Sequence, residues 1–395
     1  MARSSLEIDC KSMDRRNLQI ESLRAIAITF VLFSHLQIEV SGWYFNLPSH
    51  VELWAGVDLF FVISGFLITH SLLGLVGARE RGTAWWPELK AFWIRRAFRL
   101  LPAAWLWLLV PLLLSLLIGQ HALFAPTRTL LNDALAAVLQ VANLYWAHCI
   151  GSGQWGELCS QPPVLSPYWS LSLEEQFYLL LPILLILLPA RLLLPVLALL
   201  LITHLFWIRP ILTLAWYVRP DSLLWGVVLA LLSHRGIALG LGNSLKKLRL
   251  GMPLSLALLA LLAWVPSLGA QVAPGVAMVG IVALIGAALV WLAATGNGIR
   301  PGAFLLWMSS RSYALYLVHA PVFFLAQFLL FPEGPRFLQG RYEIALYVIC
   351  TFVAASLAAE LTYRLVESPL RGYGRKLASR QLKQSSLMSA TSTQS

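Results

Sequence analysis

Charged residues are scarce in this sequence. Of its 395 residues, 12 % are Asp, Glu, Lys or Arg and 58 % are hydrophobic, and the mean hydropathy is +0.73. A typical soluble domain has about a quarter charged residues. The 18 carboxylates cannot supply the polar surface that a soluble protein of this length needs. This composition excludes a cytosolic globular enzyme and a disordered chain, and it indicates a polytopic membrane protein.

Cysteine and acidic residues are also few. Four cysteines are too few for a disulfide scaffold, and the eight histidines are scattered without a metal-binding spacing, so no metal site is expected. The first 20 residues are polar and basic, and the apolar run after them has full membrane length, so no cleavable signal peptide is expected. In a membrane protein, the net charge of +11 indicates basic cytoplasmic loops and anionic lipid or ligand rather than nucleic acid.

Apolar runs near the length of a membrane helix, about 20 residues, recur along the chain. They predict an all-α protein with about ten transmembrane helices, at roughly 20–40, 54–77, 99–119, 170–189, 192–209, 221–234, 251–267, 272–294, 304–330 and 342–366. The segment 131–147 has apolar residues at helical spacing but also four polar ones, so we expect a buried, re-entrant or surface helix there, with an additional membrane span as the alternative.

The basic residues predict the orientation. With the N-terminus inside and ten alternating helices, all but five of the 29 Lys and Arg residues lie on the cytoplasmic side. Both termini are then cytoplasmic. This arrangement predicts a tail at 1–17, a membrane domain at 18–372 with an outside loop at about 120–168, and a disordered tail at 373–395. Cys149 and Cys159 share the outside loop, where a disulfide between them is possible.

Ionisable residues inside spans are costly and usually mark function. Arg24 and His35 lie on one face of the first helix, because 11 residues are close to three turns. Asp58, at a similar depth in the second helix, could orient the imidazole of His35 or cap its own helix. Glu39, one turn beyond His35, is the alternative carboxylate. The simpler interpretation is that His35 is a structural residue and that Arg24 extends its side chain to the membrane interface.

A basic cluster opens the third span. Arg96 and Arg99 are three residues apart and share a face, which suits a bidentate clamp for phosphates, with Arg95 as a further contact. Ordinary anchoring of a helix end by the positive-inside rule is the alternative.

The stretch SPYWSLSLEEQFY carries paired glutamates into the membrane. Glu174 or Glu175 is a candidate acid, base or hydroxyl ligand, and Ser170 or Ser172 caps the helix. Trp169 and Tyr178 could stack on a sugar ring or belong to the interfacial aromatic belt.

Tyr316 and His319 share a face of a later helix. They are candidates for substrate contact, although a lone membrane histidine is more often a structural, hydrogen-bonded residue.

Seven segments in this order resemble the acyltransferase-3 family of integral-membrane acyltransferases over about residues 17–372. They are LRAIAITFVLFSH, DLFFVISGFLI, RRAFRLLPA, YWSLSLEEQFYLLLP, RPDSLLWG, SYALYLVHAPV and YRLVESPLR. The resemblance implies that His35 is the essential histidine of the family's first-helix Arg–His pair. It also implies that Arg96 and Arg99 are the pair thought to hold CoA, and that Glu175 matches a family glutamate. Some members carry an esterase domain of the SGNH type after the last span, and we expect this chain to lack it.

The family implies transfer of an acyl group, mostly acetyl, from cytoplasmic acyl-CoA to a hydroxyl of an envelope or extracellular saccharide or glycolipid. Lipopolysaccharide, peptidoglycan and exopolysaccharide are typical acceptors. We expect a protein of the bacterial inner membrane with acetyl-CoA as donor substrate and no bound cofactor. His35 would act as general base or as acyl carrier, with Asp58 and Glu175 in support. The alternative functions are a proton-coupled transporter and a component of polysaccharide export.

Overall fold

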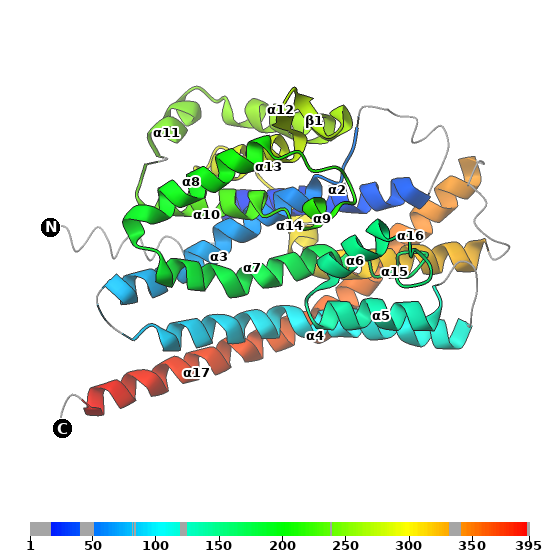
Figure 1. Ribbon diagram of the computed structural model, residues 1–395, viewed down its shortest axis with the longest axis horizontal. Coiled ribbons are helices and arrows are strands. Elements are labelled where there is room, and N and C mark those ends of the chain that lie inside the picture. Colours follow the sequence, from blue (N-terminus) through cyan, green and yellow to red (C-terminus); the bar gives the residue numbers. More distant parts are fainter. Residues whose placement is uncertain are drawn as a thin grey trace.

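The computed structural model describes residues 17–39, 51–80, 82, 84–118, 125–237, 239–331 and 341–392. Within these residues the protein is a bundle of helices with one short hairpin (Figure 1). The first half contains α2 (Leu18–Glu39), α3 (Gly56–Glu80), α4 (Trp86–Ile118), α5 (Thr127–Val138), α6 (Ala142–Gly151), α7 (Tyr168–Leu187) and α8 (Ala190–Phe206). The second half contains α9 (Leu214–Tyr217), α10 (Asp221–His234), α11 (Leu239–Lys247), α12 (Gly251–Trp264), η1 (Val265–Leu268), β1 (Gln271–Ala273), β2 (Val276–Ala277), α13 (Met278–Ala294), α14 (Ala303–Ser310), α15 (Ser312–Leu330), α16 (Arg341–Thr362), η2 (Tyr363–Glu367) and α17 (Ser368–Ser392).

Many of these helices are apolar and long. Six helical stretches of the described chain have the length and hydropathy to cross a membrane, and the apolar stretches Arg191–Phe206 and Met278–Ala294 are shorter. Their outward side chains are large and hydrophobic, such as Leu117, Leu180 and Leu199, as expected for a surface that faces lipid. The expected all-α membrane protein is therefore confirmed, and the count of ten crossings stays a prediction.

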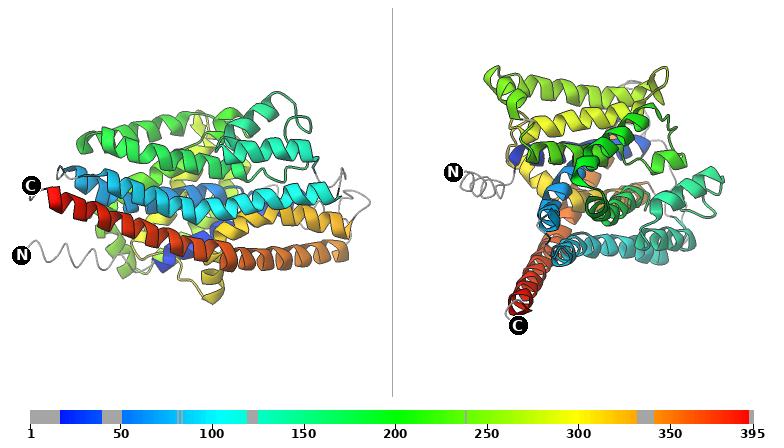
Figure 2. Two further views of the ribbon diagram at one scale, coloured as in Figure 1. Left: turned by 90° about the horizontal axis from the view of Figure 1, so that it is seen from below. Right: turned by 60° about the vertical axis from the view of Figure 1, so that its left-hand side comes forward.

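The helices run roughly along one axis, so the molecule has two ends (Figures 1 and 2). The start of α4 and the far end of α17 lie at one end, on the left of Figure 1 and of the left-hand view of Figure 2, and α5 and α6 cover the opposite end. We call these the basic end and the capped end.

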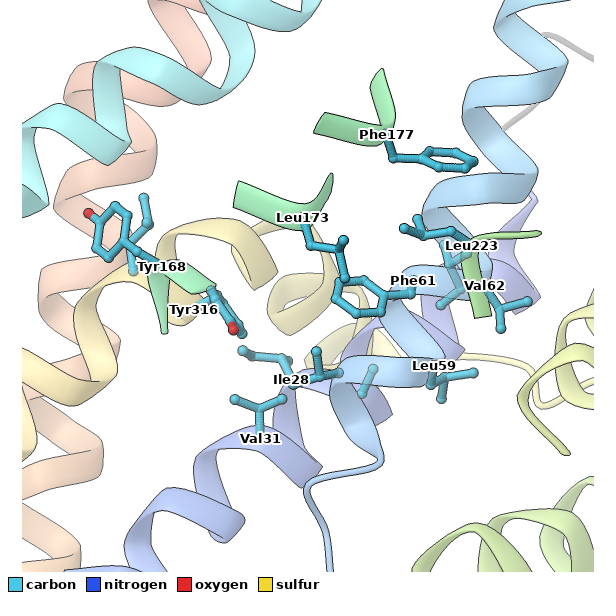
Figure 3. Packing of buried hydrophobic residues seen from close by; sticks show 14 of the residues in the cluster. Ile28, Val31, Leu59, Phe61, Val62, Tyr168, Leu173, Phe177, Leu223 and Tyr316 are labelled. Carbon is cyan, nitrogen blue, oxygen red and sulfur yellow. The ribbon is translucent and has the colours of Figure 1, made fainter. Parts of the chain in front are cut away.

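The centre of the bundle is held by the close approach of α3 and α10. Gly65 and Gly226 face each other, and a Cβ at Gly65 would come within 3.2 Å of the Gly226 Cα and collide with the Leu223 backbone. Phe61 and Val62 of α3 pack there against Leu223, with Leu173 of α7 close by (Figure 3). Small residues at such a crossing let two backbones meet, as in other membrane bundles.

Two expected segments are divided. The segment 131–147 forms parts of α5 and α6, which are separated at Gln140, where φ is +57°. The span expected at 304–330 is wrong in its first part: α14 ends at Ser310, the chain bends at Arg311, and only α15 has membrane length. The Arg311 side chain binds Glu360 of α16 at 2.8 Å and so holds this bend.

The C-terminal tail differs from the expectation of disorder. Residues 368–392 form α17, which packs along α4. Tyr373 lies with its ring 5.4 Å from that of Phe98, and Gly374 lets the backbone approach the same side chain. A tertiary contact thus orders a polar segment that has little tendency to fold alone. Of the expected N-terminal tail, residues 1–16 lie outside the described residues.

Candidate functional site

A cavity with about 680 Å³ of empty space, part of it open to solvent, lies between α2, α3, α4, α7 and α15. Three arginines, one carboxylate and several hydroxyls line it together with apolar side chains. The polar lining residues are Arg24, Ser64, Arg96, Arg99, Ser170, Glu174, Tyr178, Ser312, Tyr313 and Tyr316. We call this space the arginine cavity.

The three arginines come from two helices that are distant in sequence. Arg24 of α2 is 3.7 Å from Glu21, whose carboxylate also accepts a hydrogen bond from Ser309. Arg96 lies 5.2 Å from the centre of the Tyr178 ring. Arg99 has a buried Nε with no partner among the described residues. A guanidinium with a free, desolvated donor is prepared to bind an anion.

Arg95 is not part of this group. It does not line the cavity, because successive residues of a helix point about 100° apart. The expected pair at Arg96 and Arg99 is brought together with Arg24 in this cavity, and Arg95 lies outside its lining.

Glu174 is the carboxylate in the arginine cavity. It accepts hydrogen bonds from the Ser64 hydroxyl at 2.8 Å and from the Tyr178 hydroxyl at 2.6 Å. The family resemblance implied Glu175 rather than Glu174. Successive residues of a helix point about 100° apart, and of the two glutamates only Glu174 lines the arginine cavity, which periodicity alone does not reveal.

Glu175 lines a second cavity, of about 370 Å³, between α4 and α7. Glu174, Leu100, Leu171 and Tyr313 line both cavities, so the two adjoin. The second cavity also has an aromatic and amide lining, formed by Tyr168, Trp105 and Gln140. Gln140 lies between α5 and α6, so this cavity borders the two helices that cover the capped end.

Ser170 and Tyr316 close part of the arginine cavity. Their hydroxyl oxygens are 2.5 Å apart, and Tyr316 donates to the Pro167 carbonyl at 3.1 Å. Figure 3 shows Tyr316 near Ile28 and Val31 of α2. Both residues therefore lie in the candidate site as expected from the sequence.

His35 lies beyond this cavity. It is about 16 Å from Arg24 along α2, and its Nδ1 is 3.0 Å from the Val31 carbonyl. Its ring contacts the ring of His319 edge-on, with centroids 4.7 Å apart. His319 is fully buried. The sequence placed these two histidines on separate helices and gave no sign that they meet.

Asp58 does not orient His35. Its two carboxylate oxygens bind Arg219 at 3.2 and 3.0 Å, and Ser222 donates to it at 3.0 Å. The sequence-based role for Asp58 is wrong, because a buried carboxylate needs a cation and Arg219 supplies one. The side chain of Glu39, the alternative carboxylate, lies outside the described residues.

Trp169 is also a structural residue here. Its ring lies 4.8 Å from the Arg219 guanidinium and 5.4 Å from the Tyr217 ring, and it lines neither cavity. The indole packs over the guanidinium of the Arg219–Asp58 ion pair, and the expected sugar contact stays a prediction.

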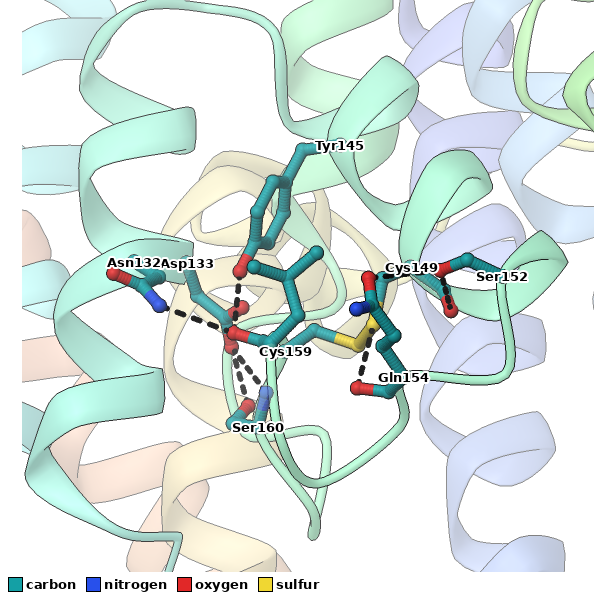
Figure 4. The surroundings of a disulfide bond; sticks show 9 residues. Asn132, Asp133, Tyr145, Cys149, Ser152, Gln154, Cys159 and Ser160 are labelled. Carbon is teal, nitrogen blue, oxygen red and sulfur yellow. Dashed lines mark hydrogen bonds between the residues drawn. A yellow bond between two sulfur atoms is a disulfide. The ribbon is translucent and has the colours of Figure 1, made fainter.

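The capped end is tied by a disulfide between Cys149 and Cys159 (Figure 4). Beside it, Asp133 of α5 accepts hydrogen bonds from the backbone N–H and the hydroxyl of Ser160. Burial raises the pKa of Asp133 to about 7. The disulfide that the sequence left open is formed, and it fixes the loop that follows α6.

Among the described residues, no group of His, Cys, Asp and Glu is arranged to hold a metal ion.

The fold defines a polytopic membrane protein with an internal cavity that three arginines line. Residues 17–360 match the acyltransferase domain family that the sequence segments resemble. The chain belongs to this acyltransferase-3 family. It is similar to the peptidoglycan O-acetyltransferase OatA of Listeria monocytogenes, with 27 % identity over 90 % of this chain and 56 % of the relative.

A second similar protein is the O-acetyltransferase OatA of Staphylococcus aureus, with 26 % identity over 90 % of this chain and 57 % of the relative. The chain thus spans a little over half the length of these curated relatives. No solved structure matches it.

Proposed function

We propose that this protein is a membrane O-acyltransferase that moves an acetyl group from cytoplasmic acetyl-CoA to a hydroxyl of an envelope saccharide or glycolipid. The observation that carries the proposal is the arginine cavity, where three guanidiniums converge and the Nε of Arg99 has no partner. CoA carries three phosphate groups on a long, flexible arm, which suits a polyanion site that leads into the bundle. The O-acetyltransferases similar to this chain support acetyl as the acyl group.

The proposed orientation places the basic end in the cytoplasm of a bacterial inner membrane. The start of α4 and the end of α17 lie together there, and the predicted excess of Lys and Arg favours the cytoplasmic side. The disulfide at the other end suits an oxidising compartment. With ten crossings, CoA would enter at the basic end and the acceptor at the capped end.

His35 is the proposed base. A carbonyl can only accept a hydrogen bond, so the contact with Val31 places the neutral ring's proton on Nδ1 and leaves the lone pair on Nε2. The acceptor's O–H proton goes to Nε2 as its oxygen bonds to the thioester carbon, and the C–S bond breaks to release CoA as the thiolate. Transfer through an acyl group on the same Nε2 is the second route.

Glu174 and the second cavity suit the acceptor. A carboxylate and an amide beside aromatic rings provide the hydrogen bonds and stacking surface that a saccharide needs. The name of the Listeria relative supports peptidoglycan as the first acceptor to test.

The test uses purified full-length protein with radiolabelled acetyl-CoA and, in separate reactions, soluble peptidoglycan strands and lipopolysaccharide. Wild type should acetylate one of them, and His35→Ala should abolish transfer while acetyl-CoA still binds. Wild-type protein that transfers no label to either acceptor, or full transfer by His35→Ala, would contradict the proposal. Transport of protons or glycan without turnover would identify a carrier instead.

A further inference from the structure

The ring of His319 contacts the ring of His35, the proposed base. The two rings come from α15 and α2 and lie edge to face, with their centroids 4.7 Å apart and their planes at 68°. Tyr316, one turn before His319, lies 5.6 Å away by ring centroid, and Phe323 closes the other side at 5.8 Å. His319 is thus enclosed among rings, with no exposed surface.

The hydrogen bonds of the two histidines leave the same atom free in each. Nδ1 of His319 is 3.3 Å from the Leu315 carbonyl, as Nδ1 of His35 is 3.0 Å from that of Val31. Each neutral ring therefore holds its proton on Nδ1 and a lone pair on Nε2. The Nε2 of His319 is buried and has no partner among the described residues.

Such an unpaired acceptor needs a reason. Leaving a buried polar atom unsatisfied destabilises a protein, and a phenyl ring would fill this apolar space without that loss. The usual neighbour of a catalytic imidazole is a carboxylate that stabilises its protonated form. Asp58, the candidate from the sequence, is bound to Arg219 and Ser222 instead.

We infer that His319 is the positioning residue for His35, in the place where other enzymes use a carboxylate. The inference rests on the proposed function. In the transfer step, the acceptor O–H bond breaks and its proton bonds to Nε2 of His35, while the C–O ester bond forms and the C–S bond gives its electron pair to the CoA sulfur. The His319 ring holds the His35 ring in place, and its free lone pair stabilises the positive charge that His35 then carries.

The test measures kcat and KM for radiolabelled acetyl-CoA in purified full-length variants, with peptidoglycan strands or lipopolysaccharide, whichever wild type acetylates. His319→Phe fills the space but has no lone pair, and its kcat should fall about 100-fold. Its KM for acetyl-CoA should stay within about threefold, because the arginines that hold CoA are untouched.

Two conservative variants separate positioning from packing. The amide oxygen of Gln is as many bonds from the backbone as Nε2, so His319→Gln should recover about tenfold of the loss in kcat. His319→Asn places its amide near Nδ1 instead and should not recover it. If His319→Phe does not fold, the comparison of Gln with Asn still decides.

His70 provides the matched control. It is another histidine of the bundle, on α3, with its ring 4.6 Å from that of Phe66, and it lines neither cavity. His70→Phe should keep the wild-type kcat. A folded His319→Phe protein with nearly wild-type kcat, or recovery by Asn rather than Gln, would overturn the inference while the proposed function stands. Wild-type protein that consumes no acetyl-CoA would overturn both.

Discussion

Arg99 has an environment that is uncommon for an arginine within a membrane bundle. It lines a cavity with two other arginines, and its buried Nε has no partner among the described residues. Arg95, one turn earlier on the same helix, lies away from that cavity. This pair of residues allows the proposed donor site to be tested against simple anchoring of a helix end.

We expect Arg99→Ala to weaken acetyl-CoA binding about 10- to 150-fold, since it removes a charge-assisted contact of roughly 1.5–3 kcal/mol. Arg99→Lys should recover little, because the planar fork is lost. Arg95→Ala is the control and should bind as wild type does. The measurement is equilibrium binding by calorimetry in detergent. Equal weakening by both alanine variants would mean that the whole basic cluster acts only through its charge.

Asp133 gives the capped end a dependence on pH. In the folded state its pKa is about 7, well above the ordinary value of 3.8, so the folded protein binds this proton more tightly than the unfolded chain does. The contribution to stability is complete below about pH 4 and is lost as the pH rises from about 4 to 7.

Relative to Asp133→Asn, wild type should therefore lose stability between pH 4 and 7, by an amount on the order of 1–4 kcal/mol. Thermal melts of both proteins across this range provide the measurement. Asn keeps an oxygen that can accept from Ser160, so the variant should fold. A difference that stays constant with pH would show that Asp133 has the same pKa in both states.

At the scale of elements, the contact of α3 with α10 positions Ser64 of α3 beside Glu174 of α7. Gly65→Val should lower stability by about 3 kcal/mol, because the backbones at Leu223 and Gly226 leave no room for a side chain. Gly74→Val, on the same helix, is the control: nothing lies within 4 Å of a Cβ there. Denaturation in detergent compares the two variants. Similar stability of both would mean that α3 and α10 are further apart than described.

At the scale of the whole molecule, orientation can be measured with a membrane-impermeant thiol reagent on intact spheroplasts. The background replaces Cys10 and Cys350 with Ser and keeps the disulfide. Arg128→Cys, exposed on α5, should be labelled at once, whereas Ser379→Cys, exposed on α17, should be labelled only after permeabilisation. The reverse labelling pattern would show that the protein has the opposite orientation in the membrane.

The sequence predicted the helical class and the shared face of Arg96 and Arg99, because those features depend on composition and on the periodicity of single helices. It could not predict partners across the bundle. Asp58 was expected beside His35 but forms an ion pair with Arg219. The residue that contacts His35 is His319, on a helix far away in the sequence. Periodicity shows which residues share a face, and tertiary packing decides what that face meets.

The helices differ greatly in length around the bundle. α4 has 33 residues and rises about 50 Å, whereas α8 has 17 and rises about 26 Å. The hydrocarbon core of a bilayer is about 30 Å thick. The bilayer beside α8, whose Leu199 and Ile202 face outward, is therefore expected to become thinner to match this helix. The protein should therefore thin the membrane on the side of α8 and attract lipids with short acyl chains to that side. Its activity should be highest when it is reconstituted in such lipids.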